Sequence, residues 1–256
     1  MLSDLTAGAL ADAAARRELV SFAEVETAAL AQSPALNALE FLAPADRIKV
    51  IAEVKRASPS RGDLAAIADP AALARTYAAN GASTISVLTE GRKFKGTLED
   101  LRAVRAEVSV PVLRKDFIAE KYQILEARAA GADLVLLIVA ALEQDLLAEL
   151  NEFALSLGLT VLVETHSREE LHRALDIDAK LIGVNARNLS TFELDRELFA
   201  SLVGEIPAGV IKVAESAVRN AKDVQHYRDA GADVVLVGEA LVTSDPAATL
   251  QSFLAV

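Results

Sequence analysis

Short apolar runs alternate with amphipathic stretches along the chain from Ile48 onward. The runs are rich in β-branched and aliphatic residues, and the stretches between them carry apolar residues at helical spacing. The runs predict strands at Val50–Lys55, Thr84–Leu88, Val112–Lys115, Leu134–Ile138, Thr160–Glu164, Leu181–Asn185, Val210–Ala214 and Val234–Val237. The amphipathic stretches predict helices at Pro70–Ala79, Leu98–Glu107, Lys121–Ala130, Gln144–Ser156, Arg168–Leu175, Arg196–Val203, Ala221–Ala230 and Pro246–Phe253. The chain is therefore organised as eight successive strand–helix units.

Turn-forming residues stand at the junctions of these units. Gly81, Gly131 and Gly231 each follow a predicted helix and precede a strand, where glycine can end the helix by adopting a positive φ. Two helices begin at an Asp-Pro pair, with Asp69 or Asp245 as the capping carboxylate and proline in the first helical position. The junctions agree with the elements that the apolar pattern predicts.

The strands read as continuous apolar runs, of which Leu134–Ile138 is the clearest. Strands of this kind are buried on both faces and pair in parallel. Eight such units in a chain of 256 residues, of which 52% are hydrophobic, predict one closed (β/α)8 TIM barrel. The alternative is an open doubly wound sheet, which would carry a glycine-rich dinucleotide turn after an early strand, and the sequence has no such turn.

The residues before the first strand are largely helical. We expect an N-terminal helical extension over residues 1–47, in which Glu24–Gln32 is the clearest helix, and a (β/α)8 catalytic domain over residues 48–256. Together they would form a single domain. The extension is expected either to cap the bottom of the barrel or to reach over the mouth of the site, and the sequence leaves both open.

Polar residues end six of the eight predicted strands. Glu53 and Lys55 are two residues apart on the first strand, so they point to one face, where an unpaired charge would be costly. One polar strand end is more often a solvated loop or a stabilising ion pair, but in this fold the C-terminal ends of the strands carry the chemistry. We therefore expect a polar rim that includes Glu53, Lys55, Lys115, Glu164, Asn185, Arg187, Glu215 and Glu239.

The loops after the last two strands predict a phosphate site. Barrel enzymes commonly bind phosphate there, through backbone N–H groups and the positive end of a short helix. The loops here contain Ser216 and Ala217, and Gly238 and Glu239. Gly238 permits close approach of a ligand to the backbone, whereas the alternative is an ordinary turn between strand and helix.

Charge and composition exclude several classes of protein. The net charge is −11 and the pI is near 4.9, which argues against non-specific binding to nucleic acid or to an anionic membrane. No apolar run approaches the roughly 18 residues that cross a membrane, and residues 1–17 do not resemble a secretory signal. Without cysteine there is no disulfide or thiolate nucleophile. We expect a cytoplasmic protein.

The three histidines have no spacing typical of a metal site. His172 and His226 fall within predicted helices and are expected on the outer, solvated face. His166 follows Glu164 closely and can approach the rim.

Five segments resemble the indole-3-glycerol phosphate synthase family: Ile51–Ser60, Pro111–Phe117, Leu162–Glu164, Ile182–Asn188 and Ala214–Ser216. The resemblance covers essentially the whole chain, including the helical extension. It implies a carbon–carbon lyase of tryptophan biosynthesis. The substrate would be 1-(2-carboxyphenylamino)-1-deoxyribulose 5-phosphate, which closes to indole-3-glycerol phosphate with loss of CO2 and water. The resemblance implies neither a metal nor an organic cofactor.

The resemblance also implies roles for the residues at the matching positions. Lys115 would be a general acid and Glu164 a general base, while Lys55 would contact the substrate carboxylate and could also act as an acid. The remaining residues would orient, polarise or bind the substrate. Glu53 and Asn185 would orient and polarise, Glu215 would lie near the ring-closing carbons, and Arg187 would brace the carboxylates from below. Ser58, Ser216, Ala217, Gly238 and Glu239 would surround the phosphate, with Phe94 and Phe117 beside the aryl pocket.

One position departs from the family's pattern. The family usually has glycine after the serine of the seventh strand, where this chain has Ala217. The Cβ of Ala217 is expected to crowd the phosphate or alter the dihedral angles of the loop. An Ala217→Gly exchange should then lower KM, with a small loss of stability because glycine loosens the unfolded chain.

Two other functions are alternatives at this level. A barrel like phosphoribosylanthranilate isomerase uses a cysteine, which this chain lacks. A paralogue could bind a phosphate ligand without turning it over. In either case the expected partner is a small phosphorylated molecule, the chain is expected to be a monomer, and other enzymes of the tryptophan pathway are the remaining partners to consider.

Overall fold

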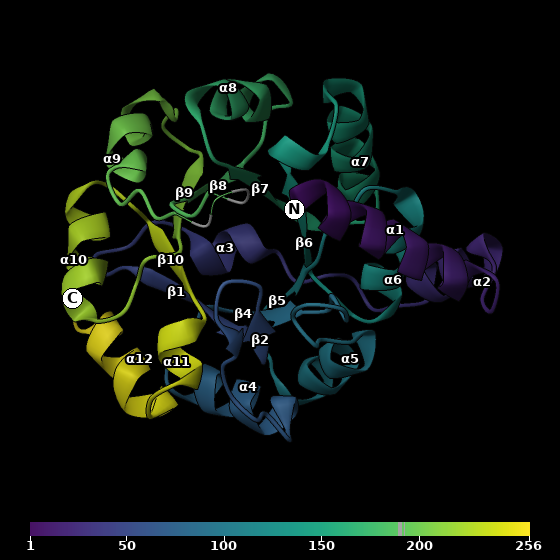
Figure 1. The fold of residues 1–256 in the computed structure, drawn as a ribbon, viewed down its shortest axis with the longest axis horizontal. Coiled ribbons are helices and arrows are strands. Elements are labelled where there is room, and N and C mark those ends of the chain that lie inside the picture. The colour runs from purple at the N-terminus through teal and green to yellow at the C-terminus, as the bar shows by residue number, and fades with distance from the viewer. Residues whose placement is uncertain (189–190, 192) are drawn as a thin grey trace.

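The computed structural model describes residues 1–188, 191 and 193–256. Within these residues, eight parallel strands close into a barrel in the order β1-β10-β9-β8-β7-β6-β5-β4 (Figure 1). The strands are β1 (Lys49–Val54), β4 (Thr84–Leu88), β5 (Val112–Lys115), β6 (Leu134–Ile138), β7 (Thr160–Thr165), β8 (Leu181–Asn185), β9 (Ile211–Glu215) and β10 (Val234–Val237). The predicted (β/α)8 barrel is confirmed.

Helices surround the barrel. They are α4 (Pro70–Ala79), α5 (Leu98–Glu107), α6 (Lys121–Ala129), α7 (Gln144–Ser156), α8 (Arg168–Asp176), α9 (Leu198–Leu202), α10 (Ala221–Asp229), α11 (Glu239–Val242) and α12 (Pro246–Leu254). The predicted caps form, since Asp69 accepts from the N–H of Ala72 and Asp245 from that of Ala248. The sequence did not predict the short helix α11 or the two-residue strands β2 (Ala57–Ser58) and β3 (Gly62–Asp63). These elements are too short to show a period.

Each barrel strand is buried on both faces. On β6, Val135 and Leu137 pack outward against the helices, whereas Leu134, Leu136 and Ile138 fill the barrel interior. The two faces belong to two separate apolar clusters, which explains why this strand reads as a continuous apolar run.

No helix of the described residues is long and apolar enough to cross a membrane.

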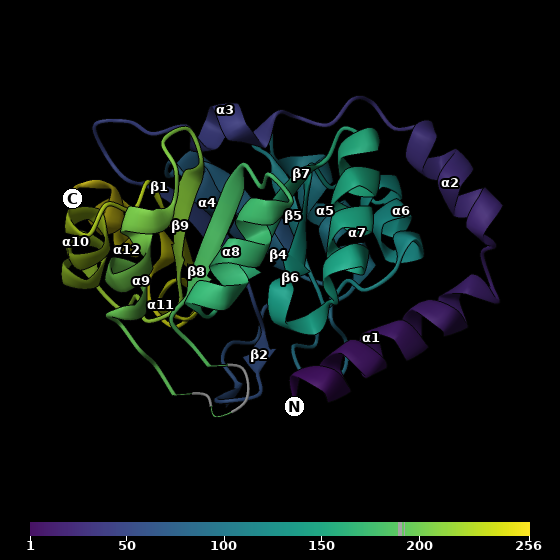
Figure 2. The ribbon, with the colours of Figure 1, turned by 90° about the horizontal axis from the view of Figure 1, so that it is seen from above.

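The N-terminal residues form helices α1 (Leu2–Arg17), α2 (Phe22–Leu30) and α3 (Ala38–Leu42). Helix α3 covers the bottom of the barrel, where Leu42 packs in one cluster with residues at the strand starts, such as Leu181 and Val234. The first turn of α1 lies at the opposite end, on the side of β2 (Figure 2). These helices therefore reach both the bottom of the barrel and its mouth, the two positions that the sequence left open.

Candidate active site

Glu53 and Lys55 form an ion pair at the C-terminal end of β1. Lys55 Nζ lies 3.0 Å from Glu53 Oε1, and Ser86 Oγ donates to Glu53 Oε2 at 3.3 Å. Glycine at position 238 leaves room for this pair, because a Cβ there would lie 2.5 Å from Glu53 Oε1 and 3.0 Å from Lys55 Nζ. Both predicted charges thus face the barrel interior, as their two-residue spacing requires.

Lys115, at the end of β5, lies between two glutamates from other strands. Its Nζ is 3.1 Å from Glu164 Oε2 on β7 and 3.4 Å from Glu215 Oε2 on β9. Both carboxylates are buried. Glu215 Oε1 packs against Gly183 on β8. A Cβ at position 183 would lie only 2.0 Å from this oxygen. Three strands therefore bring one ammonium and two carboxyl groups together.

The two glutamates differ in charge. Burial alone would raise the pKa of Glu164, but Lys115 and His166 hold it well below its usual range. Burial and the neighbouring charge of Glu164 raise the pKa of Glu215 well above its usual range, although Lys115 opposes them. Burial lowers the pKa of Lys115, and the carboxylates around it more than offset this, so the pKa rises. These directions favour an ammonium on Lys115, an ionised Glu164 and a protonated Glu215.

Asn185 connects β8 to the loop after β9. Its Oδ1 accepts from Ser216 Oγ at 2.8 Å and from the N–H of Arg187 at 3.0 Å. Ser216 and Ala217 both have left-handed backbones, with φ of 69° and 60°. The amide of Asn185 therefore holds a turn that non-glycine residues seldom adopt.

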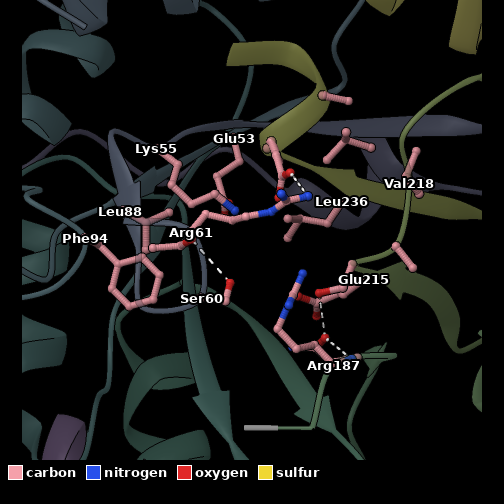
Figure 3. A pocket seen from close by; sticks show the side chains of 18 of the residues that line it. Glu53, Lys55, Ser60, Arg61, Leu88, Phe94, Arg187, Glu215, Val218 and Leu236 are labelled. Atoms are coloured by element: carbon pink, nitrogen blue, oxygen red, sulfur yellow. Dashed lines mark hydrogen bonds and ion pairs between the residues drawn. The ribbon is translucent and has the colours of Figure 1, made fainter. Parts of the chain in front are cut away.

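These groups line one cavity of about 260 Å³ at the barrel mouth. In Figure 3, Lys55 and Arg61 reach into it from one wall and Arg187 and Glu215 from the other. Of the residues predicted for the site, the cavity wall contains Glu53, Lys55, Ser58, Phe94, Lys115, Phe117, Asn185, Arg187, Glu215, Ser216, Ala217, Gly238 and Glu239. Glu164 lies behind this wall and reaches the cavity through Lys115.

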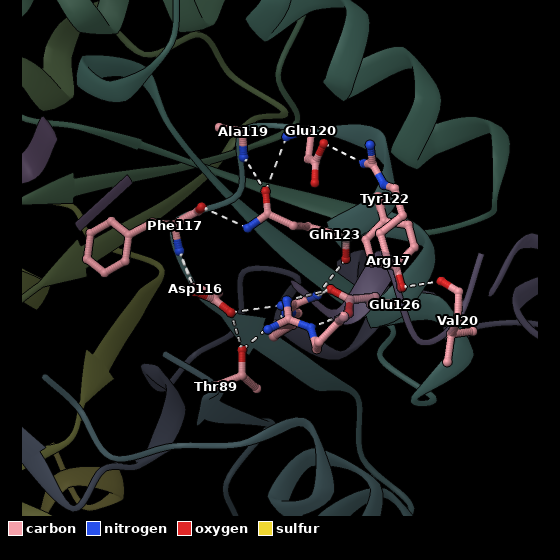
Figure 4. Close-up of polar contacts among 12 residues, drawn as sticks. Arg17, Val20, Thr89, Asp116, Phe117, Ala119, Glu120, Tyr122, Gln123 and Glu126 are labelled. Carbon is pink, nitrogen blue, oxygen red and sulfur yellow. Dashed lines mark hydrogen bonds and ion pairs between the residues drawn. The ribbon is translucent and has the colours of Figure 1, made fainter. Parts of the chain in front are cut away.

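The apolar side of the cavity is formed by Phe94 and Phe117. Their ring centroids are 6.1 Å apart, and Leu5 of helix α1 lines the cavity with them. Gln123 fixes the loop that carries Phe117 by donating to its carbonyl at 3.1 Å and accepting from the N–H groups of Ala119 and Glu120 (Figure 4). Leu5 thus brings the N-terminal extension to the cavity at the barrel mouth, one of the two positions that the sequence left open.

Basic residues surround the opposite side of the cavity. Arg187 was expected below the carboxylates, but it lies in the cavity wall, where the charges that act on it are those of Glu239, Arg61 and Arg219. Arg61 forms a 2.9 Å ion pair with Glu239. Arg61 and Arg219 were not predicted as site residues, although their positions in the loops after β1 and β9 were a signal in the sequence.

A second charged cluster lies on the outer face of β5. Arg114 is 1% exposed and contacts Asp116 at 2.8 Å, Thr89 at 3.1 Å and Glu126 at 3.4 Å. Arg16 of helix α1 pairs with the same Glu126 (Figure 4). Arg114 and Lys115 are neighbours and point to opposite faces of the strand, so only Lys115 enters the cavity.

Two histidines lie where they were expected, away from the cavity. His172 is exposed and pairs with Glu205 at 3.0 Å, and His226 lies 3.7 Å from Glu197. His166 is only 10% exposed and lies 3.2 Å from Glu164 Oε1. His166 therefore contacts Glu164 of the Lys115 cluster without lining the cavity.

The backbone at Ala217 reverses one expectation from the sequence. A left-handed residue other than glycine costs about 1–2 kcal/mol, more than the roughly 0.4–1 kcal/mol that glycine loses through the unfolded chain. Ala217→Gly should therefore raise the thermal midpoint by about 2–4 °C and also lower KM by removing a methyl group from the cavity wall. Calorimetry and steady-state kinetics measure the two effects. An unchanged KM would mean that the methyl group does not crowd the ligand.

Comparisons with known proteins agree with the site. The family model described as indole-3-glycerol phosphate synthase matches residues 2–253. A protein of that name from Leifsonia xyli subsp. xyli is 68% identical over 253 residues, covering 99% of this chain and 97% of that relative. Another from Beutenbergia cavernae is 58% identical and covers 95% of this chain and 90% of its own.

Solved structures at low identity share the barrel alone. Thiamine phosphate pyrophosphorylase from Pyrococcus furiosus has a TM-score of 0.61 at 15% identity, covering 80% of this chain and 93% of its own. The N-acetylmannosamine-6-phosphate 2-epimerase from Clostridium perfringens has a TM-score of 0.61 at 13% identity, covering 83% and 94%. With a family match over nearly its full length and relatives this similar, the chain belongs to the indole-3-glycerol phosphate synthase family.

Proposed function

We propose that this chain converts 1-(2-carboxyphenylamino)-1-deoxyribulose 5-phosphate to indole-3-glycerol phosphate, CO2 and water, with the residues of the cavity in the roles given below. The observation that carries the proposal is the placement of Lys115 3.1 and 3.4 Å from the buried carboxyl groups of Glu164 and Glu215, in the same cavity as the Lys55–Glu53 pair. The cavity wall supplies two ammonium groups, those of Lys55 and Lys115, and the carboxylate of Glu164 lies directly behind Lys115.

Ring closure requires a proton donor to the ketone oxygen, because negative charge develops there as the new carbon–carbon bond forms. Lys115 fits this role, since its ammonium is held in a buried site by Glu164 and Glu215. Loss of the carboxylate requires a cation to hold it until it leaves. Lys55 fits that requirement at the cavity wall, and Glu53 keeps its ammonium in place.

Dehydration requires a second proton for the leaving hydroxyl and a base that takes a proton from the carbon next to nitrogen. Glu164 is the ionised carboxylate and is assigned as the base. Asn185 and Glu215 would orient the reacting carbons. Ser58, Ser216, Ala217 and Gly238 would surround the phosphate, with Arg61, Arg187 and Arg219 supplying positive charge on that side.

The direct test is to add the carboxyphenylamino substrate to purified protein and follow indole fluorescence. The chain contains no tryptophan, so the protein contributes little background. We expect product to form at the same rate with and without a chelator. Activity that the chelator abolishes and a divalent ion restores would contradict the metal-free assignment. Tight binding of substrate without product would instead support the non-catalytic alternative.

A further inference from the structure

Lys115 contacts Glu164 and Glu215 at similar distances, 3.1 and 3.4 Å, and both carboxyl groups are buried. Two buried carboxylates close together cannot both stay ionised at little cost, so one of them retains a proton. Lys115 donates a hydrogen bond to Glu164 but approaches Glu215 only at ion-pair distance, so it favours ionisation of Glu164. Since the proposed reaction needs one defined base, a second cation that contacts Glu164 alone would strengthen this preference.

His166 is the group that contacts only one of them. Its Nε2 lies 3.2 Å from Glu164 Oε1, whereas Lys115 contacts the other carboxylate oxygen, Oε2. Its other ring nitrogen, Nδ1, lies 3.1 Å from Glu170 Oε2, and the same oxygen accepts from the backbone N–H of His166 at 2.8 Å. Glu170 thus fixes the ring with Nε2 at ion-pair distance from Glu164 Oε1, although Nε2 makes no hydrogen bond among the described residues. Among the described residues, Glu215 Oε1 has no hydrogen-bond partner at all.

We propose that His166, held as an imidazolium by Glu170, is a positioning residue that makes Glu164 rather than Glu215 the ionised base of the cluster. The proposal rests on the proposed function, because it assigns a cause to the role of Glu164 in that reaction. His166 does not line the main cavity and acts through Glu164.

The charges around His166 favour its protonated form. Burial alone would lower the pKa of His166, but Glu164 and Glu170 raise it to about 10. Below that pH the ring is therefore a cation. Three further groups lie on the other elements around it: Lys115 behind Glu164, and Glu193 and Asp195, which line a cavity beside the ring. Burial, Glu164 and Glu170 are the causes that set the pKa of His166.

Two variants test the proposal through the pH dependence of kcat. His166→Gln removes the cation but keeps a side-chain donor, so the pKa of Glu164 should rise and the acidic limb of kcat should move up by about one unit or more. On the acidic limb kcat should fall by about tenfold relative to wild type, whereas at neutral pH, above the shifted limb, kcat and KM should stay within about twofold of wild type. Glu170→Gln should make the imidazolium titrate at a lower pH, which adds an alkaline limb to the profile.

A matched control and an independent readout accompany these variants. His172→Gln changes an exposed histidine of helix α8 that pairs with Glu205, and it should leave the profile unchanged. The chain has three histidines, so the ring nitrogens of His166 can be assigned by NMR from the signal that His166→Gln removes. The wild-type ring should remain an imidazolium above pH 8 and should titrate lower in Glu170→Gln.

The outcomes separate this inference from the proposed function. An active wild type with an unchanged acidic limb in His166→Gln would overturn the inference alone. A lower kcat in that variant without any change of the pH profile would show that the ring only packs, which also overturns it. An inactive wild type would contradict the proposed function, and a neutral His166 ring at pH 8 in the NMR titration would contradict the inference whether or not the enzyme turns over.

Discussion

Lys115→Met is expected to lower kcat by roughly 10²–10⁴-fold while KM changes little. A proton donor to the ketone oxygen acts mainly in the transition state, so its loss should affect kcat far more than substrate binding. Methionine is close to lysine in length and is apolar, so it fills the space among Glu164, Glu215 and the barrel interior without the ammonium. Steady-state kinetics with the fluorescence assay measures both constants.

Lys180→Met is a suitable control for this variant. The side chain of Lys180 is 55% exposed and pairs with Asp178 on the surface, so the same exchange there should leave kcat unchanged. A Lys115→Met enzyme that keeps more than about a third of the wild-type kcat would rule out Lys115 as the general acid.

Gly183→Ala is expected to lower kcat by about 10²-fold, because it displaces a carboxyl group of the site. The added Cβ would lie 2.0 Å from Glu215 Oε1, and the buried carboxyl group has to move away from its seat against β8. A displacement of about 1 Å in a catalytic cluster can cost a factor of this size. Overpacking should also lower the free energy of unfolding by about 1–3 kcal/mol. Kinetics and thermal unfolding of the same sample measure the two effects.

Gly204→Ala is the control for this variant, because it adds the same methyl group at a position with open space around it. A Cβ at Gly204 would have no heavy atom within 4 Å, and its φ is not left-handed, so kcat and the thermal midpoint should stay near wild type. A folded Gly183→Ala protein with wild-type kcat would show that the position of Glu215 is not critical for the reaction.

The barrel was predictable because its signals are local. Apolar runs bounded by glycine and Asp-Pro pairs mark the strands and helices, and each predicted strand lies within one residue of the observed one at either end. The two-residue spacing of Glu53 and Lys55 was enough to place both in the interior. Side chains alternate between the two faces of a strand, so two residues that are two apart at the end of a barrel strand point into the barrel together or out of it together.

Features that depend on contacts between distant residues were not predictable. The sequence places Arg114 beside Lys115 but does not reveal that Thr89 and Glu126 hold Arg114 on the outer face. The contact of His166 with Glu164 was expected only as an approach to the rim, because Glu170 sets the direction of the ring. The left-handed backbone of Ala217 could not be predicted either, because alanine seldom adopts a positive φ.

The position of helix α1 also limits the order in which the chain can complete its structure. The partners of α1 and the linker after it are encoded far downstream: Arg16 meets Glu126 and Arg17 meets Glu120, 110 and 103 residues later. The hydroxyl of Tyr122 donates to the carbonyl of Val20, which it follows by 102 residues. On the ribosome, the first helix therefore emerges long before the surface that it covers exists. Ala13 on the apolar side of α1 stays exposed until Tyr122 and Leu125 of helix α6 have been synthesised, so the N-terminal helix of this chain docks late.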